Sequence, residues 1–251
     1  MMNESNQISK ETILFGYIGE EAGVSRFSSV INKLFKQNSV DAMMIPMNIR
    51  EDDLYFTITN MKKSHVNGAV ISGEYVDKVV DMLDEASSIV KRSEMCDIVY
   101  KENEKLRGDI FSIRVLTEHL KDMGVSKIAL IGVSHYAKAF SFLACGFELS
   151  YYNDNLEALM DFTNEVELHN PDINRIAPDM LIDLSSFDCV LDFSKLDNLS
   201  MIEKLPSINI DMKHKKQFSV LKLRADELVS NYTSYDDLID KLAFKVYRNI
   251  I

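Results

Sequence analysis

The stretch that decides the fold reads Lys127-Ile128-Ala129-Leu130-Ile131-Gly132-Val133-Ser134-His135-Tyr136-Ala137-Lys138. An apolar run that meets a glycine and continues with helix-forming residues predicts a strand, a tight turn and a helix. Dinucleotide-binding proteins carry G-x-G-x-x-G at such a turn, where the second glycine lets the backbone approach the pyrophosphate and the third lets the helix pack on its strand. Ser134 and Ala137 replace these two glycines. The stretch therefore predicts a dinucleotide-type fold with a weakened phosphate loop.

A βαβ unit extends from this stretch, with strands expected at 127–132 and 147–152 around a helix at 135–145. In nucleotide-binding units an acid about 20 positions after the first glycine accepts from the ribose hydroxyls, whereas an arginine pairs with a 2′-phosphate. Asp154 follows Gly132 by 22 positions. If a nicotinamide cofactor binds, NAD is therefore favoured over NADP. A polar strand-to-helix turn explains Asp154 equally well.

The candidate cofactor-binding residues are thus Gly132, Ser134, His135 and Asp154. His135 stands at the turn, where it could cap the helix or contact an anion when protonated. No metal is expected, because the cysteines (Cys96, Cys145 and Cys189) show no C-x-x-C spacing and the histidines show no H-x-x-x-H or H-E-x-x-H spacing.

The bulk composition excludes several classes of function. With 251 residues, 46% of them hydrophobic, the chain can build one large domain or two of ordinary size. Its formal net charge of −11 lacks the basic footprint that nucleic acid and anionic membranes require, so neither is an expected partner. No window approaches 18 consecutive apolar residues, and residues 1–7 lack a basic segment followed by an apolar core. We therefore expect a soluble, cytoplasmic protein.

The remaining patterns predict an α/β protein with two lobes. Strands are expected at 13–19, 41–49, 68–72, 188–193 and 207–211, a hairpin at 97–108, and helices at 24–35, 53–63, 74–90, 110–124 and 236–250. We expect an N-terminal α/β substrate-type domain over 1–108, a Rossmann-like domain over 109–234, and a C-terminal helix over 235–251 that packs back on the N-terminal lobe.

One long string carries a family resemblance. The stretch Gly19-Glu20-Glu21-Ala22-Gly23-Val24-Ser25-Arg26-Phe27-Ser28-Ser29-Val30-Ile31-Asn32 lies without gaps on G-x-P-x-x-H-S-K-S-P-x-x-H-N. This string and the order of elements over nearly the whole chain resemble the shikimate dehydrogenase family. The resemblance implies that Ser25 holds a substrate carboxylate, while the second serine of S-K-S is Phe27 here. A helix N-cap is the alternative for Ser25.

Two further strings of the family fall near the middle of the chain. The string N-V-T-x-P-x-K lies on 70–76, which puts Ser72 at its threonine and Val76 at its general acid/base lysine. Valine cannot transfer a proton. Tyr75 could donate one in principle, with a core or rim tyrosine as the alternative. The string A-V-N-T lies on 95–98, so Asp97 replaces a substrate-binding asparagine and can only accept hydrogen bonds when ionised.

The family's G-x-N-T-D string, the source of its catalytic aspartate, lies on 108–112. Without a gap the aspartate becomes Ser112; with a short deletion Asp109 takes its place. Asp109 is also a natural N-cap for the next helix. Near the C-terminus Lys241 holds the position of a substrate-binding glutamine, with a solvated lysine as the alternative, and the family's aspartate-tyrosine pair resembles Asp211 and His214.

The resemblance implies a protein that binds a small molecule in an interdomain cleft. The candidate catalytic residues are Asp109, Asp97 and Tyr75, and the candidate substrate-binding residues are Ser25, Ser72 and Lys241. One hypothesis is a divergent NAD(P)-dependent oxidoreductase of a polyhydroxylated carboxylic acid or related metabolite. The other is a non-redox descendant, either a binding protein or an enzyme of another reaction type. Ordinary shikimate dehydrogenase activity is not expected, because Val76 stands in place of the family's acid/base lysine and a positioned proton donor contributes roughly 10²–10⁴-fold to rate. Whether the chain forms a homodimer stays open.

Overall fold

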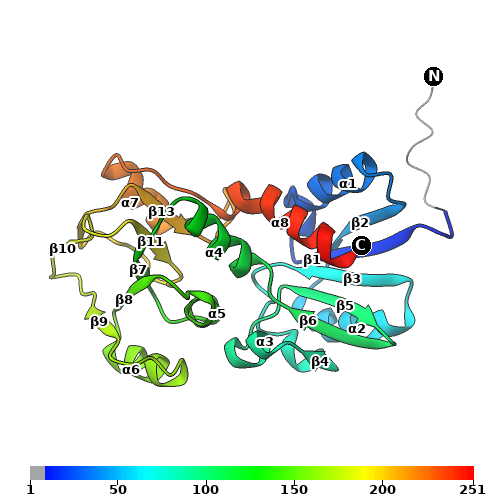
Figure 1. Cartoon of the computed structure of the whole chain (residues 1–251), viewed down its shortest axis with the longest axis horizontal. Coiled ribbons are helices and arrows are strands. Elements are labelled where there is room, and N and C mark those ends of the chain that lie inside the picture. The colour runs from blue at the N-terminus through cyan, green and yellow to red at the C-terminus, as the bar shows by residue number, and fades with distance from the viewer. Residues whose placement is uncertain (1–8) are drawn as a thin grey trace. The chain divides into compact units, whose positions relative to one another are not determined.

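The computed structural model describes residues 9–251, which divide into two compact units (Figure 1). Unit 1 runs to Phe111 and regains the chain at Ile239–Ile251, and unit 2 comprises Ser112–Leu238. Residues 1–8, which contain the N-terminal stretch considered above for targeting, lie outside the described residues. Each unit is built around its own sheet.

Within the described chain, unit 1 contains a mixed sheet in the order β2-β1-β3-β5-β6-β4. The first three strands are parallel, and β3 and β5, like β5 and β6, pair antiparallel. The strands are β1 (Ile13–Gly19), β2 (Ala42–Asn48), β3 (Val66–Ile71), β4 (Glu85–Ala86), β5 (Ile98–Glu102) and β6 (Lys105–Asp109). The helices are α1 (Phe27–Gln37), α2 (Glu51–Asn60) and α3 (Ser88–Ser93), with single 3₁₀ turns at Ala22–Val24, Met61–Lys63 and Val80–Met82.

An apolar stripe fixes α1 on the sheet. Phe27, Ile31 and Phe35 recur at helical spacing and are buried, as the amphipathic pattern predicts. Phe27 stacks on Tyr17 of β1 with ring centroids 5.5 Å apart. Asn32 of the same helix donates to the carbonyl of Met44 at 2.9 Å and accepts from its N–H at 2.7 Å. Asn32 therefore ties α1 to β2.

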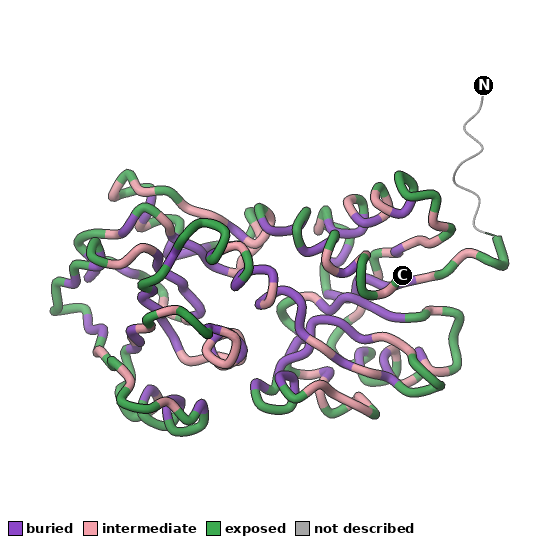
Figure 2. The backbone as a smooth tube through the Cα atoms, viewed as in Figure 1, coloured by how far each residue is buried: buried purple, intermediate pink, exposed green. Residues whose placement is uncertain are grey.

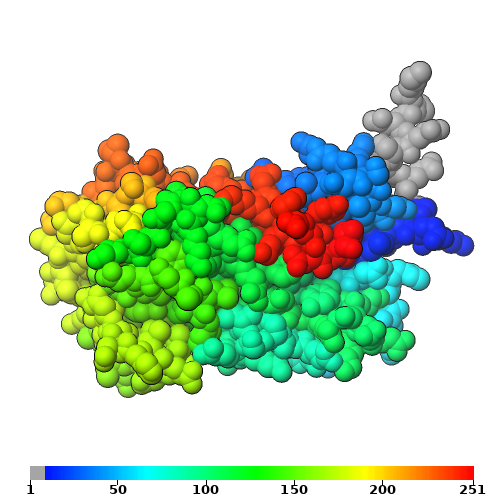
Figure 3. Space-filling model, viewed as in Figure 1, coloured from blue at the N-terminus to red at the C-terminus, as the bar shows by residue number. Residues whose placement is uncertain are grey.

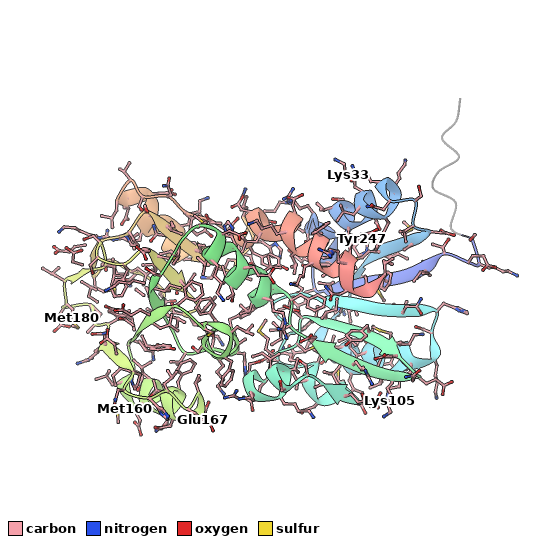
Figure 4. The ribbon with its side chains drawn as sticks, viewed as in Figure 1. Lys33, Lys105, Met160, Glu167, Met180 and Tyr247 are labelled. Atoms are coloured by element: carbon pink, nitrogen blue, oxygen red, sulfur yellow. The ribbon has the colours of Figure 1, made fainter. Side chains whose placement is uncertain are left out.

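The hairpin expected over 97–108 is confirmed as β5 and β6. Asn103 and Glu104 both have positive φ, 50° and 62°, the geometry of a two-residue type I′ turn. Lys105, labelled in Figure 4, begins β6 and forms an ion pair with Glu85 at 2.5 Å. A tight two-residue turn at Asn103 and Glu104 therefore sets the register of β5 and β6.

The helix expected over 74–90 is wrong. This segment instead folds as a 3₁₀ turn, the short strand β4 and the start of α3. The backbone N–H of Asp84 donates to Leu106 at 3.0 Å, the Asp84 carboxylate accepts from the N–H of Leu106 at 2.8 Å, and the N–H of Ser87 donates to Gly108 at 3.1 Å. These bonds pair the backbone of the segment with β6 at the edge of the sheet. Tertiary pairing therefore overrides a weak helical pattern.

Unit 2 contains a parallel sheet in the order β13-β11-β7-β8-β9 among the described strands. From the β9 edge, the strands are third, second, first, fourth and fifth in chain order, which is the doubly wound order of dinucleotide-binding folds. These strands are β7 (Lys127–Ile131), β8 (Glu148–Asn153), β9 (Asp172–Arg175), β11 (Cys189–Asp192) and β13 (Ile208–Asp211). The expected Rossmann-like architecture is therefore confirmed.

Among the described residues, five helices lie wholly or partly in unit 2. They are α4 (Ser112–Asp122), α5 (His135–Leu143), α6 (Leu156–Glu165), α7 (Val220–Glu227) and α8 (Tyr235–Ile250), the last of which continues into unit 1. Two of them, α5 and α6, connect strands of the unit 2 sheet. A small separate pair joins β10 (Ile182–Asp183) to β12 (Ile202–Lys204). Sequence patterns did not predict α6, α7, β9, β10 or β12.

Both faces of the central strand β7 are buried (Figure 2), as expected for a parallel sheet. Ala129 and Ile131 belong to a core cluster that includes Val190 of β11 and Val220 and Leu221 of α7. The near-continuous apolar run of β7 thus follows from its central position.

The part of α8 that belongs to unit 1 packs on α1. Asp240 forms an ion pair with Arg26 just before α1, and the ring of Tyr247 (Figure 4) lies 6.0 Å from that of Phe35. In Figure 3 these C-terminal residues, in red, lie beside the blue residues of α1.

The turn after β7 has no room for a side chain at Gly132. Its φ is +96°, and a Cβ there would lie 2.6 Å from the Cα and N of Ser194. The N–H of Gly132 donates to Tyr152 and the N–H of Phe193 donates to Ile131, both at 2.8 Å. Gly132 therefore sits where the chain ends of β7, β8 and β11 converge.

Gly132→Ala should destabilise the protein much more than Gly146→Ala. Gly146 has nearly the same φ, +95°, but nothing within 4 Å of its Cβ position. We expect Gly146→Ala to cost roughly 1 kcal/mol for backbone strain alone and Gly132→Ala about 3 kcal/mol or more. Urea unfolding measures both, and equal losses would contradict a close packing of Gly132 on Ser194.

Candidate functional site

Several predicted site residues of unit 1 share one edge of its sheet. The carboxyl ends of β1 and β3, the start of β5 and the end of β6 meet there because of the strand directions. The N–H of Ser72 donates to Ile18 at 2.8 Å, the N–H of Ile71 to Asp97 at 2.9 Å, and the N–H of Asp97 to Asp109 at 3.2 Å. The structure thus brings Ser72, Asp97 and Asp109 into one row.

Glu74 organises one end of this row and was missed by the sequence patterns. The Ser72 hydroxyl donates to its Oε2 at 2.5 Å, and the N–H of Glu20 donates to its Oε1 at 2.9 Å. Gly19 makes this contact possible, because a Cβ there would lie 2.7 Å from the Cβ of Ser72 and 2.8 Å from Oε1 of Glu74. Only its place two residues after the predicted strand end could have indicated Glu74.

The two candidate aspartates differ in exposure. Asp97 is 6% exposed and accepts from the N–H of Phe111 at 2.7 Å. Asp109 is half-buried, and its Oδ1 accepts from the Ser87 hydroxyl and from the N–H of Ile110, both at 2.8 Å. The next helix, α4, begins at Ser112, three residues after Asp109. Asp109 is thus an edge residue that holds Ser87.

Tyr75 is a core side chain. It is 1% exposed, and its hydroxyl donates to the carbonyl of Ile49 at 2.8 Å. Burial, together with the negative charges of Glu20 and Glu74, raises the pKa of Tyr75 to about 12. Such a phenol holds its proton tightly at neutral pH, and its geometry matches the core alternative.

The two remaining predicted site residues of unit 1, Ser25 and Lys241, lie just before α1 and on α8. The Ser25 hydroxyl oxygen accepts from the N–H of Phe27 at 3.2 Å, next to the start of α1. The N-cap of α1 is Arg26, so Ser25 lies one residue before the capping position that the sequence offered as its alternative. Lys241 is exposed on α8. Val76 is 3% exposed, and Lys78, two residues on, forms an ion pair with Glu51 at 2.5 Å.

In unit 2 the predicted strand, turn and helix at residues 127–138 are confirmed. Ser134 is the N-cap of α5 and accepts from the N–H of Ala137 at 3.4 Å, and His135 begins the helix in a half-buried position. The chain passes from β7 to β8 on one side and returns to β11 on the other side of β7. Gly132 and Ser134 therefore lie at the topological switch point, where doubly wound sheets bind their ligands.

Asp154 lies at the same carboxyl edge, directly after β8. It is exposed, and its carboxylate accepts from the N–H of Asn155 at 3.0 Å; Asn155 in turn caps α6 by accepting from Ala158 at 3.1 Å. Arg175 ends β9 in register with Asn153. An acid and a guanidinium thus stand at the ends of neighbouring strands.

Two buried aspartates lie at this edge; the resemblance had singled out Asp211, whereas Asp192 was not identified from the sequence. Asp192 ends β11 and Asp211 ends β13, and the two pair in register. They are 3% and 0% exposed. An acid as the last residue of each apolar strand was the available signal, because the carboxyl ends of parallel strands share one edge.

The two carboxylates have unequal partners. Asp211 accepts from the Ser219 hydroxyl at 2.5 Å, the Tyr232 hydroxyl at 2.7 Å and the N–H of Lys213 at 3.1 Å. Asp192 accepts at Oδ1 from the N–H of Ser194 at 2.9 Å, and within residues 9–251 its Oδ2 has no hydrogen-bond partner.

Burial changes the ionisation of Asp192 and of Tyr232. Burial raises the pKa of Asp192 from 3.8 to about 6; the hydrogen bonds from Ser194 and the charge of Lys213 oppose the rise, and the charge of Asp211 adds to it. Burial and the bond to Asp211 also raise the pKa of Tyr232 far above its ordinary value.

His214 follows β13, at the position matched to the family's tyrosine. Its Nδ1 lies 3.3 Å from Oδ1 of Asp236, and its ring meets that of Tyr235 edge-on at 4.9 Å. The pair Asp236–His214 thus holds the imidazole in one orientation.

Groups of metal-ligating side chains and membrane-spanning helices are absent from the described part of the chain. From residue 9 onward, no three His, Cys, Asp or Glu side chains are grouped so that they could hold a metal ion. Cys96 and Cys189 are buried, which raises the pKa of both thiols. Across the same residues, each helix is too short or too polar to cross a bilayer.

Curated proteins with similar sequences include shikimate dehydrogenases. No family model matches the chain. The shikimate dehydrogenase (NADP(+)) of Dictyoglomus thermophilum is 28% identical over 149 residues, which cover 57% of this chain and 54% of that protein. The match thus spans about half the length of this curated relative.

Solved structures share the fold over nearly the whole chain. The shikimate dehydrogenase of Aquifex aeolicus superimposes with a TM-score of 0.75 at 16% identity, covering 96% of this chain and 94% of that one. The ligand-free 5-ketofructose reductase of a Gluconobacter strain gives 0.72 at 13% identity, covering 97% and 100%. At these identities the likeness establishes the fold alone.

Asp192 should make stability fall as the pH rises. Its pKa in the folded chain, about 6, exceeds its ordinary value of 3.8, so the folded state binds more protons between these values and loses stability as the proton leaves. Relative to Asp192→Asn, the wild type should lose about 1.4 kcal/mol of unfolding free energy between about pH 5 and pH 8.

Urea unfolding at both pH values measures this difference. Asp188→Asn is the matched control at the opposite end of the same strand, because three hydrogen bonds lower the pKa of Asp188 and keep it ionised over this range. A pH-independent difference between wild type and Asp192→Asn would contradict the raised pKa.

Proposed function

We propose that the chain, which is similar to a shikimate dehydrogenase over about half of its sequence and shares the fold of that family, is an NAD(P)-dependent oxidoreductase of a small polyhydroxylated carboxylic acid or a related metabolite. The observation that carries this proposal is the doubly wound sheet of unit 2, with Gly132 and the capped helix α5 at its switch point. The relative from Dictyoglomus thermophilum is named as an NADP(+) enzyme, which supports the same class of cofactor here.

The residues present fit a dinucleotide in part. The backbone turn at Gly132 and the N-terminus of α5 would hold the pyrophosphate, because a helix N-terminus favours an anion. Ser134 and Ala137 add side-chain atoms where dinucleotide loops carry glycine, which predicts weaker binding than in an intact loop. A bound nicotinamide would supply the hydride acceptor or donor.

Asp154 favours NAD over NADP in this proposal. Its carboxylate can accept from the ribose hydroxyls and would repel a 2′-phosphate. Arg175, which ends the neighbouring strand, is the cation that would oppose this preference.

We expect NADH to bind more tightly than NADPH. Asp154→Ala should reduce the ratio of the NADPH dissociation constant to the NADH dissociation constant by roughly tenfold, since one charge-assisted hydrogen bond and one repulsion are lost together. Separate titrations that follow the fluorescence of NADH and of NADPH as each binds the protein measure the two constants. Arg175→Ala is the complementary control and should raise the ratio. A preference for NADPH in the wild type that Asp154→Ala leaves unchanged would contradict this role.

For proton transfer we propose the acids of the unit 1 edge. Val76 cannot move a proton, and the Tyr75 hydroxyl is bound to Ile49. Asp109 is half-buried whereas Asp97 is buried, so Asp109 is the more accessible general base. Ser72, in the same row, is the proposed substrate contact, with Ser25 and Lys241 as further candidates.

A binding function without hydride transfer is the second candidate. Two positions that the resemblance matches to polar groups of the family, Phe27 and Val76, are apolar and buried, at 0% and 3% exposed. Buried apolar side chains at these two positions favour a protein that binds its ligand without hydride transfer.

One assay separates the two candidates. With NAD and a panel of polyhydroxylated carboxylic acids, the oxidoreductase proposal predicts formation of NADH at 340 nm that Asp109→Asn lowers by roughly 10²–10⁴-fold. The exposed Asp81, changed to Asn, is the control and should leave the rate unchanged. Saturable binding of an acid without NADH formation would support the second candidate, and unchanged turnover in Asp109→Asn would remove Asp109 from the mechanism.

A further inference from the structure

Helix α2 of unit 1, labelled in Figure 1, has an outer face that carries two aromatic side chains. Leu54 and Ile58 of the helix are buried, whereas Tyr55 and Phe56 are 66% and 71% exposed. A single exposed apolar residue is ordinary, but aromatic side chains are enriched in the cores of protein interfaces. The outer face of α2 is therefore a candidate docking surface.

This face continues past the end of α2. Asn60 and Met61 have helical backbone angles, with φ of −78° and −55°, so the 3₁₀ turn Met61–Lys63 extends the helix by almost one turn. Residues three and four positions apart share one face of a helix. Four residues at this spacing lie on the outer face of α2: Asp52, Phe56, Thr59 and Lys63.

The two ends of the outer face carry opposite charges. Asp52 and Asp53 lie in the first turn of α2, and Lys62 and Lys63 lie at the far end. Lys62 forms an ion pair with Asp84 at 2.6 Å, whereas within residues 9–251 Asp52 and Lys63 are exposed and form no ion pair. They are separated by a rise of about 16 Å along the helix and cannot reach each other. A partner that pairs with both must present the same charges in the reverse order.

A second copy of α2 presents that order when the two helices run antiparallel. A two-fold axis between residues 57 and 58 places Asp52 opposite Lys63 of the partner subunit, and by symmetry this pair forms twice. The same axis places Phe56 opposite Thr59 of the partner subunit, so the aromatic rings lie at the centre of the contact. Antiparallel helices pack in this way at shallow crossing angles. The outer face of α2 is therefore complementary to itself.

We propose that the chain forms a dimer with a second copy of itself through the outer face of α2, as an antiparallel helix pair related by a two-fold axis. The order of charges identifies the occupant, because α2 itself supplies the complementary order. The proposal does not depend on the proposed function, since α2 carries none of the residues assigned to substrate or cofactor.

The dimer is expected to be weak. One helix pair of this length buries less than the roughly 1,200 Å² at the lower limit of stable interfaces. The net charge of −11 on each copy also opposes association. We therefore expect a dissociation constant on the order of 10 µM.

Sedimentation velocity from about 1 µM to about 300 µM, on either side of this constant, tests the proposal. The wild type should change from monomer to dimer over this range. Phe56→Ala should raise the dissociation constant about 100-fold, because a symmetric dimer loses two rings and each costs about tenfold. Phe218→Ala is the matched control, since Phe218 is 70% exposed and lies in unit 2, and it should dimerise as the wild type does.

Reversal of the charges tests the antiparallel register. Asp52→Lys and Lys63→Glu each place like charges opposite one another and should each weaken the dimer about tenfold. The double variant exchanges the two charges and should restore the wild-type constant, although a base at the start of a helix and an acid at its end are unfavourable for the helix itself. Circular dichroism confirms that each variant is folded.

Three results would overturn the proposal. The first is a wild type that stays monomeric over the whole range, and the second is a dimer that Phe56→Ala leaves unchanged or that Phe218→Ala weakens equally. The third is a double variant that dimerises no better than Asp52→Lys or Lys63→Glu alone. Each of these leaves the proposed function standing, because cofactor binding and turnover are measured separately.

Discussion

The convergence of three chain ends at Gly132 is the constraint on which unit 2 depends. At φ +96°, with the backbone of Ser194 at 2.6 Å from the position of a Cβ, this residue can hardly be anything but glycine. The close approach lets β11 return beside β7 while β8 lies on its other side. That arrangement creates the switch point and places Ser134, Asp154 and Asp192 along one edge. Gly132 therefore has a structural reason to be present whether or not a phosphate binds beside it.

The same distinction between architecture and chemistry holds in unit 1. Asn32, which agrees with the family string, ties α1 to β2 through both backbone groups of Met44. Gly19, which also agrees, provides the space that Ser72 and Glu74 occupy. Positions that differ, such as Phe27 and Val76, are packed in the core. What the chain shares with the family thus includes contacts that hold the fold, and the acids of the sheet edge have donors of their own.

Sequence patterns predicted most strands because a buried parallel strand is a continuous apolar run, as in β7, and because Gly124 and Gly132 mark where elements end. They failed at residues 74–90, where the helical spacing of apolar residues was real but Asp84 and Ser87 bond to β6. Glu74 and Asp192 were missed for a related reason. Each also depends on a residue distant in the chain, Glu20 for Glu74 and Asp211 for Asp192, and neither has a local spacing that a motif describes. The resemblance supplied Ser72, Asp97 and Asp109, and the strand directions explain why they are neighbours.

The central claim is that unit 2 binds a nicotinamide dinucleotide at the carboxyl ends of β7 and β11. Hydrogen–deuterium exchange with and without NAD tests this claim most directly, because bound ligand slows the opening of the backbone that it contacts. The account predicts protection in peptides that cover 130–138 and 190–196, with the amino-terminal ends of the same strands unchanged. Protection confined to other segments, or none at saturating NAD and NADP, would contradict it.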